Sequence, residues 1–403
     1  MTREIGGQDW SAADAWRQRF GMMSASAPSF ESALESNQEI ADAAGAPEDR
    51  IKRAREEMRR IVQEHFGGDA ALLAAVDSAK VTSEQAMNVL RDAQRAPTSA
   101  EYGSLEAIVA FDGTRPSFLV RDGDIDFESS YCTSPWKTTL KPRREQLAAF
   151  AACVGRIEVG EIGIGTAFLI SPTLALSNRH VAQAIAQFGP SGITVKSDVY
   201  LDFGREHQGR ESHDRRAVRK VLFAGKRLIA PPIDHEKLDL ALLGVDASSS
   251  SEHRDRRLEF APSVAEVDAG WMVATVGYPA DWRQWVPTEF VNEYGELIAK
   301  LLEGEKGTKR FAPGQSGGML AETANATGPR SAMHDATTIN GNSGSPLAII
   351  DGAAPLQAVG LHYGGQWAGQ RANWAHVLAA CANAEVTGGV DLRTALKQHD
   401  ITL

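Results

Sequence analysis

The chain has few cysteines and no pattern of metal ligands. Only Cys132, Cys153 and Cys381 occur among its 403 residues, and a sparse, odd set of this kind is not a disulfide framework. There is no His-Glu-x-x-His motif, no paired Cys-x-x-Cys motif and no phosphate-binding loop. We therefore expect neither a metal nor a nucleotide cofactor.

Long apolar runs and an excess of positive charge are also absent. Residues 1–20 are polar and of mixed charge, and no segment approaches the length of a membrane span. We expect no secretory signal, no membrane partner and a cytoplasmic location. The net charge of −10 argues against nucleic-acid binding. Two basic runs, residues 215–220 and 254–257, are expected to be exposed loops.

The most informative segment that is present covers residues 337–347, Thr-Thr-Ile-Asn-Gly-Asn-Ser-Gly-Ser-Pro-Leu. It places Ser343 in a glycine-rich loop that can present a nucleophile. A serine hydroxyl reacts only when a base removes its proton, so a histidine and an orienting acid are needed elsewhere. An α/β-hydrolase would need glycine two residues after the serine, where Ser345 stands.

Candidates for the base and the acid occur upstream of this loop. Residues 165–172 are typical of a buried strand and turn, and residues 174–182 carry a second strand that leads to His180. Asp239 lies in the apolar run 238–243, where a buried carboxylate needs a hydrogen-bonding partner. The imidazole N–H of His180 is the natural partner.

The order along the chain supports a catalytic triad. His180, Asp239 and Ser343 follow the chymotrypsin order and not that of subtilisin or the α/β-hydrolases. Each residue taken alone also fits a structural role, as a satisfied histidine, a turn cap or a hairpin loop. All three in this order favour the triad, with the backbone N–H groups of Gly341 and Ser343 as the oxyanion hole.

With these motifs, residues 144–403 resemble trypsin-like serine peptidases of the bacterial glutamyl endopeptidase type. The His180 and Ser343 segments, the Asp239 run and residues 356–365 carry the resemblance. It implies a mainly β fold of two six-stranded antiparallel β-barrels with the triad in the cleft between them. It also implies an endopeptidase that cleaves protein or peptide substrates through an acyl-enzyme. The strand-like run 271–279, bounded by turn residues, agrees with such a fold.

The resemblance also implies a pocket for an acidic side chain. In that family, the positions of Thr338 and His362 hold the substrate carboxylate, which would give a preference for Glu or Asp at P1, the residue before the cleaved bond. Packing roles for both residues remain an alternative, and His334 could also line the pocket. Asn342 stands where animal members have the aspartate that pairs with a newly cut N-terminus, so activation by that route is not expected.

The first third of the chain has a different pattern. Apolar residues at three- and four-residue spacings predict an amphipathic helix in the region 46–95, namely Ile51, Met58, Ile61, Val62 and Phe66. Thr82 and Gln85 form a capping-box pattern that predicts a further helix start. We therefore divide the chain into a helical accessory or regulatory region, 1–130, and a peptidase domain, 131–403.

The role of the N-terminal region stays open between two hypotheses. It could be a small accessory bundle without chemistry of its own, or an inhibitory or partner-sensing segment that is removed or displaced on activation. The acidic stretch 121–130 would offer cleavage sites to an enzyme that cuts after acidic residues. Three functions follow: an intracellular serine endopeptidase, a catalytically silent binding module on a protease fold, and a trigger-activated protease of a bacterial defence or stress system.

Overall fold

The computed structural model describes most of the chain in separate ranges. These are residues 4–5, 8–9, 13, 16–17, 20, 22, 45–92, 94–128, 134–190, 192–207, 214–279, 293–303, 307–323, 328–338, 341–351, 356–366, 372–384 and 390–403. Cys132 lies outside them. Cys153 and Cys381 are buried and free.

The first barrel contains six antiparallel strands in the closed order β10-β11-β12-β7-β6-β5. They are β5 (Val154–Val159), β6 (Ile162–Ser171), β7 (Leu174–Ser177), β10 (Val199–Asp202), β11 (Arg215–Ala224) and β12 (Ala241–Val245). Helix α8 (Arg179–Ile185) follows β7, and the hairpin β8 (Ala186–Gly189) and β9 (Gly192–Val195) follows α8. The second predicted strand therefore ends at Ser177, and His180 lies in the first turn of a helix.

One loop prediction was wrong in this barrel. Residues 215–220 were expected to be an exposed basic loop, but they lie in strand β11. Arg216 is only 1% exposed, and its guanidinium forms a bidentate ion pair with the buried carboxylate of Asp214. Alternation along the strand turned Arg216 and Val218 inward, and a neighbouring acid made burial of the arginine possible.

The second barrel is also six-stranded and antiparallel. Its order is β13-β16-β17-β18-β15-β14, and pairing between β13 and β14 closes it. The strands are β13 (Ala269–Gly277), β14 (Arg310–Met319), β15 (Ser331–His334), β16 (Pro346–Ile349), β17 (Ala358–Gln366) and β18 (Ala372–Val377). A hairpin of β3 (Phe118–Arg121) and β4 (Asp124–Asp126) extends this sheet from β14. The predicted pair of β-barrels is confirmed.

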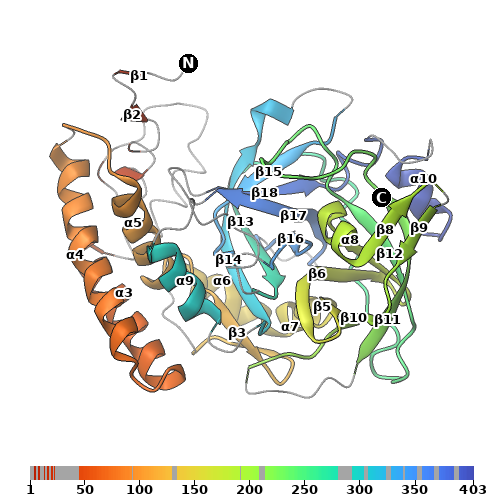
Figure 1. Cartoon of the computed structure of the whole chain (residues 1–403), viewed down its shortest axis with the longest axis horizontal. Coiled ribbons are helices and arrows are strands. Elements are labelled where there is room, and N and C mark those ends of the chain that lie inside the picture. The colour runs from red at the N-terminus through yellow and green to blue at the C-terminus, as the bar shows by residue number, and fades with distance from the viewer. Residues whose placement is uncertain are drawn as a thin grey trace.

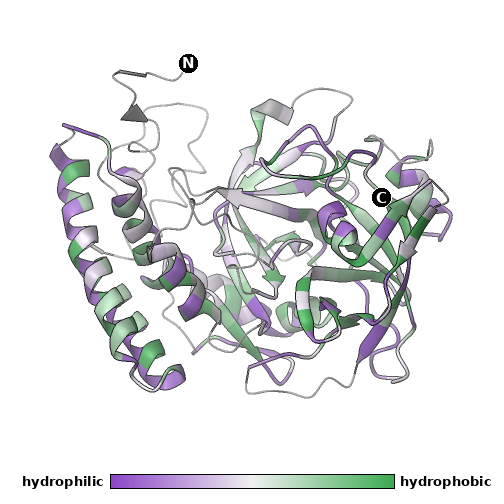
Figure 2. Ribbon diagram, in the orientation of Figure 1, coloured by the Kyte–Doolittle hydropathy of each residue, from purple (hydrophilic) through white to green (hydrophobic). Residues whose placement is uncertain are grey.

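A helical module precedes the barrels, as predicted. It contains α3 (Pro47–His65), α4 (Ala70–Asp92) and α5 (Ser99–Phe111), and their apolar faces form one core. Helix α9 (Glu293–Glu303) adds to the same core, although it lies between β13 and β14 in the sequence. We call these four helices the helix bundle. Figure 1 shows it beside the second barrel, and green and purple residues alternate along α3 and α4 in Figure 2.

The predicted helix start at Thr82 was wrong. Thr82 lies in the middle of α4, and its hydroxyl is 2.7 Å from the hydroxyl of Tyr294 on α9. A capping box does occur at the start of α5, where Thr98 and Glu101 each accept a hydrogen bond from the other's backbone N–H. The Thr82 pattern is common in sequences, and a tertiary contact gave this hydroxyl a different partner.

Short elements complete the fold. The connection from the β3–β4 hairpin to the first barrel contains α6 (Ser134–Leu140), a 3-10 turn (Lys141–Arg143) and α7 (Arg144–Ala152). Another 3-10 turn (Ala321–Thr323) follows β14, and helix α10 (Leu392–Lys397) lies near the C-terminus. Two short strands, β1 (Glu4–Ile5) and β2 (Gln8–Asp9), pair near the N-terminus.

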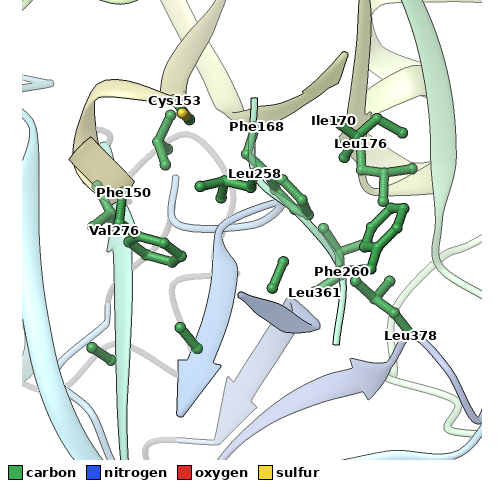
Figure 3. Close-up of a cluster of buried hydrophobic side chains, with 14 of the residues drawn as sticks. Phe150, Cys153, Phe168, Ile170, Leu176, Leu258, Phe260, Val276, Leu361 and Leu378 are labelled. Carbon is green, nitrogen blue, oxygen red and sulfur yellow. The ribbon is translucent and has the colours of Figure 1, made fainter. Parts of the chain in front are cut away.

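The two barrels share a continuous apolar core. Side chains of the first barrel, such as Phe168 and Leu176, belong to the same buried cluster as Val276 and Leu361 of the second. Figure 3 shows these side chains pointing toward one another between strands of both barrels. Because both barrels contribute to this core, it holds them in one relative position.

Candidate active site

The geometry of His180 is set by Asp239. His180 lies in the first turn of α8, and Asp239 lies just before β12, separated from it by Leu240; β12 is the strand paired with β7. The His180 Nδ1 atom is 2.6 Å from Asp239 Oδ2, and the His180 backbone N–H donates to Asp239 Oδ1 at 2.9 Å. Asn178 donates from Nδ2 to the Asp239 backbone oxygen at 2.8 Å. The sequence-predicted acid and base are therefore in direct contact.

Burial and charge act in opposite directions on this pair. Burial of the His180 ring lowers its pKa, but the charge of Asp239 and the hydrogen bond to it outweigh burial, so the pKa is raised. Burial alone would raise the pKa of Asp239, but the charge and hydrogen bonds of His180 lower it. Asp239 is 4% exposed, whereas one third of the His180 side chain remains exposed. The pair thus places a strengthened base at an accessible surface.

The Ser343 loop is bound to strands of both barrels. The backbone oxygen of Ser343 accepts from Thr166 N–H of β6 at 2.8 Å, and Gly344 N–H donates to His362 O of β17 at 2.9 Å. Gly344 has φ +93°, and a Cβ there would lie 1.9 Å from Thr166 O. Glycine is therefore required, because a side chain would separate the loop from β6.

Gly341, a predicted oxyanion-hole residue, also has a left-handed backbone. Its φ is +93°, a value that favours glycine, and its carbonyl accepts from Thr166 Oγ1 at 2.8 Å. Gly277 of β13 leaves room behind the loop, since a Cβ there would lie 2.3 Å from Asn342 Oδ1. The loop conformation is thus set by contacts on several sides.

His180 and Ser343 approach the same point of β6. A Cβ added at Gly165 would lie 2.8 Å from Cγ2 of Val181, which follows His180, and 3.3 Å from the Ser343 backbone oxygen. Only a residue without a side chain allows both segments to come this close. The structure therefore brings the segments of all three triad candidates together where the two barrels meet.

The two predicted pocket residues lie on neighbouring segments of the second barrel. His362 Nδ1 is 3.2 Å from His334 Nε2 on β15, and both rings are buried. Burial is the largest effect on His362, and with the nearby His334 and His180 it places the pKa of His362 well below the usual value. His362 is therefore neutral at neutral pH. Thr338 is also buried, and its hydroxyl donates to Asn373 Oδ1 at 2.7 Å.

Sequence reasoning missed Asn373 and a second buried histidine, His376. Asn373 lies opposite His334 on β18 and donates from Nδ2 to Ala336 O at 2.8 Å. The Nε2 atom of His376 accepts the backbone N–H of Asp239 at 2.9 Å. Neither residue belongs to a recognisable motif, so only strand register could have indicated them.

His376 is itself fixed by further side chains. Its Nδ1 lies 3.1 Å from Ser331 Oγ, and its ring stacks on Tyr363 at 4.2 Å between centroids. Tyr363 OH donates to Ser331 Oγ at 3.1 Å and lies 2.8 Å from His235 Nδ1. Burial lowers the pKa of His376 to about 4, so at neutral pH its Nε2 can act as an acceptor. This network fixes the ring whose Nε2 accepts the backbone N–H of Asp239.

Among the residues that the structure describes, no three His, Cys, Asp or Glu side chains are arranged to hold a metal ion. None of the described helices combines the length and the apolar character that a membrane span requires.

Comparison with known proteins agrees with the geometry of the site. Residues 165–354 match the family model described as a trypsin-like peptidase domain. That range contains His180, Asp239 and Ser343. The match supports a trypsin-like peptidase in that range.

A second similarity extends beyond the matched range. A probable serine protease of Lysobacter enzymogenes is 29% identical over 297 residues, covering 70% of this chain and 74% of that protein. Among solved structures, neuropsin, a serine protease expressed in the limbic system of mouse brain, is similar with 13% identity and a TM-score of 0.37. That match covers 57% of this chain and 91% of neuropsin.

Proposed function

We propose that this peptidase is a serine endopeptidase with Ser343 as nucleophile, His180 as general base and Asp239 as the orienting acid. The observation that carries the proposal is the 2.6 Å contact between His180 Nδ1 and Asp239 Oδ2 beside the Ser343 loop. Because Asp239 occupies Nδ1, the Nε2 atom of His180 is the one that takes the serine proton. Backbone N–H groups of Gly341 and Ser343 stabilise the oxyanion.

The reaction then follows in two steps. Ser343 Oγ attacks the peptide carbonyl while His180 takes its proton, and His180 returns the proton to the leaving amine as the acyl-enzyme forms. Water, activated by the same histidine, hydrolyses the ester and regenerates Ser343. Asp239 holds the imidazole in one tautomer and stabilises its positive charge during both steps.

A fluorophosphonate probe tests this proposal without knowledge of the substrate, because it reacts with an activated serine alone. We expect one label per chain at Ser343, and none in Ser343→Ala. A Ser345→Ala variant is the matched control, since it removes a neighbouring buried hydroxyl. A folded wild-type protein that resists labelling would instead support the alternative of a catalytically silent binding module.

We further propose a preference for Glu or Asp at P1, based on His362. If His334 Nε2–H donates to His362 Nδ1, the neutral His362 carries its hydrogen on Nε2 and can donate to a substrate carboxylate. Thr338 contributes less in this geometry, because its hydrogen is already donated to Asn373. The pocket therefore recognises a carboxylate by a neutral donor and not by a full positive charge.

Peptides varied only at P1 test this preference. We expect hydrolysis after Glu or Asp to exceed hydrolysis after Gln or Asn. His362→Leu should remove this difference while fluorophosphonate labelling continues. His362→Gln, which keeps a donor, should retain part of it. An equal rate for Glu and Gln in the wild-type enzyme would contradict the acidic pocket.

The biological setting is proposed on other grounds. We propose an intracellular enzyme that is regulated through its N-terminal region, either as an inhibitory segment or in a trigger-activated defence or stress response. The free thiols of Cys153 and Cys381 fit a reducing compartment. Cell fractionation would test the location. Mass spectrometry of the active enzyme would show whether the N-terminal region has been cut.

A further inference from the structure

The chain between the helix bundle and strand β3 contacts the segment that carries His334 and Thr338. Residues 112–117 are all buried, although they link two elements, and connecting segments usually lie on the surface. Arg115, at the centre of this linker, is 4% exposed. This unusual burial indicates that the linker has contacts on both sides, one set to the bundle and one to the second barrel.

On the bundle side, the linker is anchored by Asp112. One carboxylate oxygen accepts from Arg50 Nε of α3 at 2.8 Å, and both side chains are at most 1% exposed. The other oxygen accepts from the backbone N–H and the hydroxyl of Thr114 at 2.8 and 2.6 Å. Trp136 donates from Nε1 to Thr114 O at 2.9 Å. The residue before Arg115 is therefore held in place by α3 and α6.

On the barrel side, Arg115 contacts the segment 334–338, which we call the pocket wall. Arg115 Nη2 donates to Asp335 Oδ2 at 2.5 Å and to Gln315 Oε1 at 3.1 Å. Thr337 Oγ1 donates to the Arg115 backbone oxygen at 2.7 Å. The second oxygen of Asp335 accepts the backbone N–H of Gln315 at 2.7 Å, so β14 completes the contact.

The pocket wall contains the groups expected to line the pocket. Asp335 follows His334, which contacts His362, and Thr337 precedes Thr338, which contacts Asn373. Arg115 thus binds Asp335 and Thr337, the residues directly next to His334 and Thr338 in the wall. A shift of Asp335 or Thr337 would therefore move His334 and Thr338 as well.

We propose that Arg115 is a positioning residue through which the helix bundle holds the pocket wall in its substrate-binding geometry. The proposal rests on the proposed peptidase function and adds to it that the N-terminal region contributes to substrate recognition. Arg115 does not touch the substrate. It acts through Asp335 and Thr337 on the residues beside them. Any partner that moves the bundle would then change the pocket directly.

Arg115→Met tests the proposal, because methionine fills similar space without the charge or the donors. We expect kcat/KM for peptides with Glu at P1 to fall by about 10- to 100-fold, mainly through KM, as for a loss of positioning outside the reacting groups. Fluorophosphonate labelling of Ser343 should stay within about three-fold, because the probe has no P1 side chain. Arg143→Met is the matched control, since Arg143 is a buried arginine that binds Ile350 O instead.

A second variant covers a failure to fold. Arg115→Met leaves the Asp335 carboxylate without its cation, and Arg115→Met with Asp335→Asn removes that charge while keeping the oxygen that Gln315 binds. Both variants should lose kcat/KM for peptides with Glu at P1, while fluorophosphonate labelling of Ser343 continues. An unchanged kcat/KM for these peptides would overturn the proposal. It would also be overturned if Arg115→Met lost peptide cleavage and labelling equally, to the same extent as Arg143→Met.

The proposal can fail separately from the proposed function. If the wild-type protein resists fluorophosphonate labelling, the proposed peptidase function is rejected. Backbone hydrogen exchange of residues 331–338 then still measures whether Arg115 holds the pocket wall. Faster exchange of these amides in Arg115→Met than in Arg143→Met would support the role of Arg115. Equal exchange would reject it.

Discussion

The basicity of His180 depends on one carboxylate. Burial of the imidazole lowers its pKa and Asp239 more than restores it, so the net pKa is above the ordinary value of about 6.5. The general base must be neutral, so kcat/KM should fall as the pH decreases through this raised pKa. In the wild-type enzyme we expect the acid limb of the pH profile to lie above pH 6.5.

Asp239→Asn separates the effect of burial on the His180 pKa from the effect of the Asp239 carboxylate. Without the carboxylate, burial of the ring remains, so the acid limb should move to lower pH. We also expect kcat to fall by about 10⁴-fold, because the asparagine favours the wrong imidazole tautomer. The pH dependence of kcat/KM measures both changes, with Ser343→Ala as the inactive control. An acid limb that does not move in Asp239→Asn would contradict this account of His180.

The support behind Asp239 gives a second prediction. His376→Leu leaves the Asp239 backbone N–H buried without its acceptor, at a cost of about 1–3 kcal/mol. We expect kcat to fall by about ten-fold at unchanged KM, and His376→Gln to restore part of the loss through its amide oxygen. Val377→Ala provides a buried control on the same strand. Equal kcat in the leucine and glutamine variants would show that the acceptor is unimportant.

Among the elements, the Ser343 loop is the one most restricted by its neighbours. Gly344→Ala would place a Cβ 1.9 Å from Thr166 O at φ +93°. We expect a loss of about 3 kcal/mol or more in the free energy of unfolding, together with a loss of labelling. Gly160→Ala is the control, because φ is +64° there but no atom lies within 4 Å. It should cost about 1 kcal/mol, as measured by denaturant unfolding.

The elements that were predicted correctly have local causes. Helix α3 follows from apolar residues at helical spacing, and β6 and β7 follow from apolar runs separated by a turn. The Ser343 loop follows from its glycines. These patterns lie within short windows of the sequence, where the local conformation decides the structure. The triad candidates could be found because each lies in such a window.

The elements that were missed depend on contacts between distant segments. Thr82 meets Tyr294 across 212 residues, and Arg115 meets Asp335 across 220. Asn373 and His376 acquire their partners from strand register, which a single sequence does not specify. Helix α9 has an amphipathic pattern, but its partner helices lie in the first third of the chain. Such contacts require the fold before they can be inferred.

At the scale of the whole molecule, the helix bundle and the second barrel are interdependent. Helix α9 enters the bundle from between two barrel strands, and the β3–β4 hairpin, which lies N-terminal to the predicted boundary at residue 130, pairs with β14. The predicted division of the chain at residue 130 stays a prediction. Contacts of α9, of the β3–β4 hairpin and of Arg115 all cross it.

Removal of helices α3 to α5 should therefore affect the barrels. In a variant that starts at residue 112, α9 would expose five side chains that are now at most 3% exposed: Tyr294, Leu297, Ile298, Leu301 and Leu302. Their burial contributes on the order of 10 kcal/mol, which is comparable to the stability of a whole domain. We expect this variant to aggregate or to melt well below the full chain, as measured by light scattering and thermal unfolding.

The outcome bears on how the N-terminal region could regulate the enzyme. A variant that starts at residue 112 and also carries Leu297→Glu and Leu301→Lys tests whether the exposed face of α9 causes the instability, because these changes make that face polar. If this variant is soluble but still does not cleave peptides with Glu at P1, the bundle supplies both the stability of the barrels and the geometry of the pocket. Regulation would then act by moving the bundle in place, since its removal would destroy the enzyme. If the variant that starts at residue 112 instead unfolds at the same temperature as the full chain and cleaves peptides faster, the bundle is a removable inhibitor.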